Sequence, residues 1–112
     1  MELYDELQSK SAQLDVAVKR LRKSGTEYAE AEKDYKICLR EEVLRLREEG
    51  MPVGIIDKAI YGVKKVAELR LKRDIALTVY EANKESIAAI KLQIRLIDNQ
   101  ISREWGQAGR GL

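Results

Sequence analysis

Large apolar residues recur every seven positions through the first half of the chain, and this period constrains the fold more than any other feature. A second apolar set stands four residues after positions of this seven-residue series or of its continuation, and consists of Val18, Leu39 and Leu46. A sustained seven-residue repeat gives a helix one apolar stripe that packs against another helix, as in a coiled coil. The sequence therefore predicts an all-α protein. The ladder consists of Leu7, Leu14, Leu21, Tyr28 and Tyr35.

The first helix is predicted over residues 2–49. Gly50 follows the last periodic residue and Pro52 stands two positions later, which is the usual pattern at the end of a helix. Residues 24–27 resemble a capping box that would begin a new helix. Because the ladder crosses this segment without a change of phase, one unbroken helix with a weak point at Gly25 is favoured, and a break there is the alternative.

The second helix is predicted over residues 63–105, which contain neither Pro nor Gly. Residues 90–96 alternate apolar and polar like a strand, but a lone strand would leave its backbone groups without partners, so a helix is favoured. Arg73 interrupts the main apolar stripe, and Asn83 within it is expected to fix the register between helices. The other members of the stripe are Val66, Leu69, Ala76, Tyr80, Ile87, Ile90, Ile94, Ile97 and Ile101.

The two helices are expected to return on each other as one antiparallel helical-hairpin domain over residues 1–105. A short helix is predicted in the turn at residues 50–62, and a flexible tail at residues 106–112. The apolar residues of the turn either fold over the ends of the long helices or form an exposed tip that docks a protein partner. A DNA-binding helix-turn-helix is a weaker interpretation of this region. The tip residues are Ile55, Ile56, Ile60 and Tyr61.

A second apolar line runs along the back of the second helix, nearly opposite the main stripe. The first helix can cover only one of these two faces, so the second is expected to pack against another copy of the chain. An antiparallel four-helix dimer of two hairpins would cover both faces, and a different protein is the alternative cover. The predicted oligomer interface comprises Leu71, Ile75, Ala82, Ala89, Leu92 and Leu96.

Basic residues form a possible alternative surface, although the formal net charge is only +2. If the hairpin folds about residues 54–60, the basic residues of the two helices would lie at a similar height and form a band that contacts nucleic-acid phosphates. Acidic residues interleave with them, as on an ordinary solvated helix, so nucleic acid is the less favoured partner. The residues concerned are Lys19, Arg20, Arg22, Lys23, Lys91 and Arg95.

The composition excludes several chemistries. The chain has no His, which excludes imidazole bases and His-containing zinc sites, and Cys38 alone cannot form a Cys cluster or an intramolecular disulfide. No phosphate-binding loop or cleft for paired carboxylates is apparent, so we expect no enzymatic activity, no cofactor and no small-molecule substrate. With no targeting segment and no apolar run that could cross a bilayer, we expect a cytoplasmic protein without a membrane partner.

Five segments of the chain, at residues 27–36, 50–53, 66–70, 92–95 and 104–105, resemble a family of small uncharacterised helical proteins from phages and prophages of Gram-positive bacteria. The resemblance covers most of the chain and carries no active-site residues. It implies a viral protein made in the host cytoplasm, encoded among genes for phage DNA replication or recombination. We therefore expect an oligomeric coiled-coil scaffold or adaptor, with an accessory role in DNA replication, recombination or end protection as the alternative.

Overall fold

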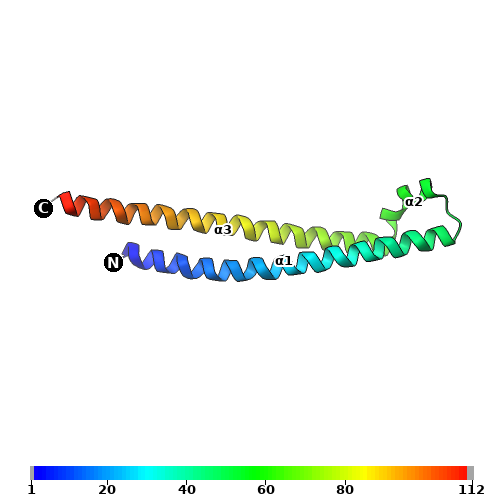
Figure 1. Cartoon of the computed structure of the whole chain (residues 1–112), viewed down its shortest axis with the longest axis horizontal. Helices are drawn as coiled ribbons and strands as arrows, with labels where there is room; N and C mark the ends of the chain where they lie inside the picture. Colours follow the sequence, from blue (N-terminus) through cyan, green and yellow to red (C-terminus); the bar gives the residue numbers. More distant parts are fainter. Residues whose placement is uncertain (1, 111–112) are drawn as a thin grey trace. The chain divides into compact units, whose positions relative to one another are not determined.

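The computed structural model describes residues 2–110, with side chains through Gln107 (Figure 1). No strand occurs among these residues, so the strand interpretation of residues 90–96 is wrong, and the predicted all-α helical hairpin is confirmed. A short 3₁₀ helix, η1, joins the second α-helix to the third. The elements are α1 (Glu2–Glu48), α2 (Val53–Ala59), η1 (Ile60–Gly62) and α3 (Lys64–Arg110).

The chain divides into two compact units, and α1 and α3 contribute a segment to each. Unit 1 contains Met1–Arg22 and Glu81–Leu112, and unit 2 contains Lys23–Tyr80. Within each unit the two helices lie side by side (Figure 1). In unit 2 they are antiparallel, because the ring of Tyr28 stacks on that of Tyr80 while Tyr35, further along α1, meets Arg73, an earlier residue of α3.

The predicted ladder forms the inner face of α1. All five of its members are buried or half-buried, as a stripe against a second helix requires. α1 passes through Gly25 without interruption, so the alternative of a break is wrong. A Cβ atom at Gly25 would lie 3.1 Å from Cε1 of Tyr80, whose ring stacks on Tyr28 with centroids 6.1 Å apart. The missing side chain thus lets the backbone of α1 approach this aromatic pair closely.

The end of α1 is a Schellman motif. Gly50 has φ +88°, a left-handed conformation that glycine adopts without a steric penalty. Its N–H donates to the carbonyl of Arg47 at 3.0 Å, and the N–H of Met51 donates to that of Leu46 at 3.1 Å. The side chain of Met51 then packs on the cluster that contains Leu46. Pro52 is the N-cap residue of α2, and its carbonyl accepts hydrogen bonds from the backbone N–H groups of Ile55 and Ile56.

The best-packed part of unit 2 lies where α2 and η1 cover α1 and α3. Ile56 is 2% exposed and Val66 is fully buried, and partly buried apolar side chains surround them. A third element therefore closes the core that two helices alone would leave open. The members of this buried cluster are Tyr35, Leu46, Ile56, Ile60 and Val66.

Among the described residues, unit 1 consists of the paired segments of α1 and α3. Ala17 and Ile87 are its buried residues among the side chains that the structure describes, and the remaining stripe residues are half-buried. Nδ2 of Asn83 donates a hydrogen bond of 3.4 Å to the backbone carbonyl of Arg20, across the two helices. This contact places Asn83 at the level of Arg20, and its role in setting the register stays a prediction.

The helix boundaries differ from the predictions most at the C-terminus. α1 ends at Glu48 and α3 begins at Lys64, each within one residue of expectation. However, α3 continues to Arg110, so the predicted boundary of the tail at residue 106 is wrong. Gly106 costs about 1 kcal/mol against Ala in a helix, but without a following Pro it does not stop one. Residues 111–112 of the predicted tail lie outside the described residues.

Candidate functional site

The back of α3 carries large apolar side chains in both units. In unit 2, Leu71 is 60% exposed and Ile75 is 56% exposed. In unit 1, Leu92 and Leu96 are each about half exposed, and Ala82 and Ala89 of the predicted interface are exposed as well. Each unit therefore presents part of the predicted oligomer interface to solvent in the single chain.

The structure divides the predicted tip into two pairs of residues. Ile55 and Tyr61 are about half exposed, and the guanidinium of Arg70 lies over the ring of Tyr61 at 5.2 Å. Ile56 and Ile60 are buried in the unit 2 core instead, because the first turn of α2 and η1 point inward over α1 and α3. For these two residues the alternative that the turn folds over the long helices is confirmed and a docking role is wrong, whereas Ile55 and Tyr61 remain candidates.

The six basic residues proposed for nucleic-acid contact are all exposed but are not aligned at one height. Because Asn83 contacts Arg20 in unit 1, Lys91 lies eight residues beyond that level, about 12 Å along α3 at 1.5 Å per residue. Arg95 lies a further turn away. The prediction of a common height is wrong, because the hairpin register is set several residues away from the assumed turn. Lys19 and Arg22, three residues apart, leave α1 on the same side, whereas Arg20 leaves it in a direction about 100° from that of Lys19. Of the six basic residues, Lys23 belongs to unit 2 and the other five belong to unit 1.

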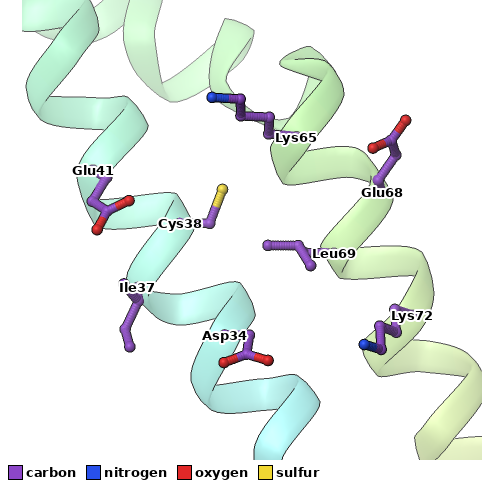
Figure 2. A pocket seen from close by; sticks show the side chains of 8 residues that line it. All are labelled: Asp34, Ile37, Cys38, Glu41, Lys65, Glu68, Leu69 and Lys72. Carbon is purple, nitrogen blue, oxygen red and sulfur yellow. The ribbon is translucent and has the colours of Figure 1, made fainter.

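A shallow groove of about 550 Å³ between α1 and α3 of unit 2 was not predicted (Figure 2). Cys38 and Leu69 point toward each other at its centre, and Ile37 lies at the α1 border (Figure 2). Asp34 and Glu41 stand on the α1 side, and basic side chains stand on the α3 side. The full lining is Asp34, Ile37, Cys38, Glu41, Lys65, Glu68, Leu69 and Lys72.

The environment of Cys38 makes its thiol harder to ionise. Burial of the sulfur is the largest cause that raises the pKa of Cys38, followed by the negative charges of Glu42 and Glu41. Lys65 has an opposing but smaller effect. A nucleophilic cysteine needs a lowered pKa, so this site does not have the electrostatics of a catalytic thiol.

Polar groups on the inner faces of unit 2 have local partners. Arg73 donates to Asp74 at 2.8 Å and its guanidinium lies 4.5 Å from the ring centre of Tyr35, a favourable cation–π geometry. Glu42, which is buried, accepts from Arg45, and Arg45 also donates to Glu49 at 2.7 Å. These contacts explain how charged residues are accommodated beside the core without implying a reaction.

No group of three or more His, Cys, Asp or Glu side chains within residues 2–110 is arranged to hold a metal ion. In the same part of the chain, none of the helices combines the length and apolar character that a membrane crossing requires.

Comparison with models of protein families, with curated proteins and with solved structures gives no match to this chain. The functional argument for each candidate surface therefore comes from the geometry and charge of its own residues.

Proposed function

We propose that this chain is a non-enzymatic interaction protein, a scaffold or adaptor that self-associates through the back of α3. The observation that carries this proposal is the row of exposed apolar side chains on that face. Leu71 and Ile75 in unit 2, and Leu92 and Leu96 in unit 1, are each about half exposed, so burying the rest of each side chain would contribute about half of the roughly 1.5 to 3 kcal/mol of full burial. Soluble proteins that expose such rows commonly bury them against a partner.

Self-association leaves the tip available for a second, different protein. Ile55 and Tyr61 present apolar surface there, and Val53 beside them is also exposed. An adaptor of this design would hold copies together through α3 while each tip binds the partner. The resemblance to small helical phage proteins supports a role in the cytoplasm of an infected host.

The test of this proposal is the mass in solution. Replacing Leu92 and Leu96 with Glu should raise the dimer dissociation constant about 100-fold or more, because two buried leucines are replaced by charges that resist burial. Light scattering over a concentration series would measure the change. The matched control is Gln8→Glu with Ala12→Glu, which adds two exposed acids with the same spacing on α1 of the same unit. A wild-type chain that stays monomeric at high concentration would overturn the proposal.

The second candidate function is an accessory role in nucleic-acid metabolism, favoured by the exposure of all six basic residues. Phosphate contacts release counterions, so binding to a labelled duplex or single strand should weaken steeply as salt rises. Neutralising Lys19, Arg20, Arg22 and Lys23 together should abolish that binding. Binding that ignores both the salt and the substitutions would contradict phosphate recognition.

A further inference from the structure

The groove of unit 2 has opposite charge on its two sides. Asp34 and Glu41 lie on the α1 side, seven residues apart, and Lys65 and Lys72 lie on the α3 side with the same spacing. Figure 2 shows the two lysine side chains extending toward α1. Seven residues are close to two helical turns, so each pair lies along one line parallel to its helix.

Most of these charges are not neutralised within the chain. Glu68, the remaining charged residue of the lining, pairs with Lys64 at 3.9 Å, and Asp34 makes a loose contact of 3.8 Å with Lys33. Within residues 2–110, Glu41, Lys65 and Lys72 make no ion pair. They are therefore available to charges on another molecule.

Apolar side chains border the charged lines on both outer edges. Ile37, about half exposed, lies at the α1 edge. On α3, a second hollow of about 270 Å³ lies against Leu71 and Ile75 and shares Glu68 and Lys72 with the groove. This face of unit 2 thus has an apolar centre at Cys38 and Leu69, charged lines on either side and apolar edges.

Two copies can bring this face together about a twofold axis in either of two directions. An axis perpendicular to the helices sets α1 against α1 and α3 against α3, which brings acids to acids and lysines to lysines. An axis parallel to the helices sets α1 of each copy against α3 of the other. Only the parallel axis matches opposite charges, and like charges in an interface cost several kcal/mol.

The heights of the residues agree with the parallel axis. Asp34 precedes Cys38 by four residues, and Lys72 follows Leu69 by three, so both lie in the same direction from the groove centre. At 1.5 Å per residue they differ in height by about 1.5 Å. The same count on the other side of the centre places Glu41 at the level of Lys65. A parallel axis preserves height, so each acid would meet a lysine of the second copy.

We propose that the unit 2 groove is a self-recognition site, occupied by the same groove of a second copy about a twofold axis parallel to α1 and α3. Ile37 of each copy then packs toward Leu71 and Ile75 of the other, and both tips lie at the same end of the dimer. This inference rests on the proposed self-association and adds the relative orientation of the two copies and the pairing of acids with lysines between them.

Charge reversal tests the site. Lys65→Glu with Lys72→Glu should raise the dimer dissociation constant about 100-fold, because four acids then meet across each half of the interface. The matched control is Arg40→Glu with Arg47→Glu, two exposed residues also seven apart, which leave α1 on the side away from the groove. Reversing all four groove charges, with Asp34→Lys and Glu41→Lys added, should restore dimerisation. A dimer that survives the double reversal at unchanged affinity overturns the proposed site.

Mixing tests the orientation. Isotope-labelled wild type is combined with the fourfold reversed variant, and native mass spectrometry counts the mixed dimers. A parallel axis would set acids of the wild type against acids of the variant, so homodimers should form and mixed dimers should be rare. An axis perpendicular to the helices would match opposite charges between the two proteins. A predominance of mixed dimers would therefore overturn the parallel axis.

A third measurement needs no variant, in case the reversed chains fail to fold. Cys38 is the chain's single thiol and lies at the groove centre, so its alkylation reports whether the groove is covered. The alkylation rate should fall as protein concentration passes through the dissociation constant measured by light scattering. A rate independent of concentration in a chain that does dimerise would place the interface elsewhere and leave the proposed function standing. A chain that never dimerises would overturn both proposals.

Discussion

Unit 1 and unit 2 are built from segments of the same two helices, but within residues 2–110 another element packs on the pair only in unit 2. α2 and η1 cover one end of that unit, and there Val66 is fully buried and Ile56 nearly so. In unit 1 the most buried large side chain that the structure describes is Ile87, at 9% exposure. Two helices can shield a stripe between them, but complete burial of large side chains requires a third surface.

The difference in packing between the units also explains where contacts with another molecule are needed. Unit 2 has its own buried core, so the helices that form its exposed groove are held in place without a partner. Unit 1 has a half-buried stripe on one side of α3 and exposed leucines on the other. Its helices should therefore open more easily than those of unit 2 until another molecule covers them.

The largest expected effect comes from the covered core of unit 2. Ile56→Ala should reduce the free energy of unfolding by about 2 to 5 kcal/mol, because it removes buried methyl groups and leaves a cavity. Ile55→Ala is the matched control, since it is the same change at the neighbouring, half-exposed position, and should cost less than about 1 kcal/mol. Urea unfolding followed by circular dichroism would compare them. Equal losses would mean that α2 does not close the core.

Hydrogen exchange measures whether the helices of unit 1 open independently of those of unit 2. Ile87→Ala should speed the exchange of amides in α1 and α3 of unit 1, with a stability loss of about 1 to 3 kcal/mol, at the low end for isoleucine because half-exposed neighbours can close the gap. Amides around the unit 2 cluster should keep their protection. If protection were lost equally in both units, the hairpin would unfold as one cooperative structure and unit 1 would not open separately.

Gly25→Ala should have a smaller effect on stability, and the sign of that effect should depend on the ring of Tyr80. Alanine would favour the helix by about 1 kcal/mol, but its Cβ would lie 3.1 Å from a ring atom of Tyr80. That ring is held by stacking on Tyr28, so displacing it should cost more than the helix gains, for a net loss of about 1 kcal/mol.

A double-mutant cycle sharpens this test. In a Tyr80→Leu background the obstructing ring is absent, and Gly25→Ala should then stabilise the chain by up to about 1 kcal/mol. Thermal unfolding of the four proteins would give the coupling. A stabilising Gly25→Ala in the wild-type background would show that the aromatic pair is not packed as closely as the helix geometry indicates.

Much of the fold follows from local sequence signals. The heptad ladder predicts the inner face of α1 because period and burial are directly linked in a helix, and Gly50 before Pro52 predicts its end because that pattern suits a left-handed cap. The persistence of α3 beyond residue 105 was missed, since Gly106 weakens a helix without ending it.

The candidate sites were less predictable because they depend on the register between helices. The charges at residues 34 and 41, and at 65 and 72, each repeat with a heptad spacing that could have been noticed in the sequence. That the two lines flank one groove depends on pairing Cys38 with Leu69, which no local pattern reveals. The same dependence explains why Ile56 and Ile60 were misassigned as docking residues, and why the basic groups were placed at one height.

The smallest expected effect concerns the reactivity of Cys38. Burial and the charges of Glu42 and Glu41 raise the pKa of the thiol, so at a given pH less thiolate is present than in the unfolded chain. Alkylation by iodoacetamide should therefore be slower than in urea, and its pH profile should be displaced to higher pH. Glu41→Gln removes one raising charge and should speed the reaction about two-fold at neutral pH, whereas the control Glu48→Gln should leave it unchanged. The measurement is made in dilute protein, where the groove is uncovered. A folded-state profile displaced to lower pH would contradict the described environment of Cys38 and weaken its use as a reporter of groove coverage.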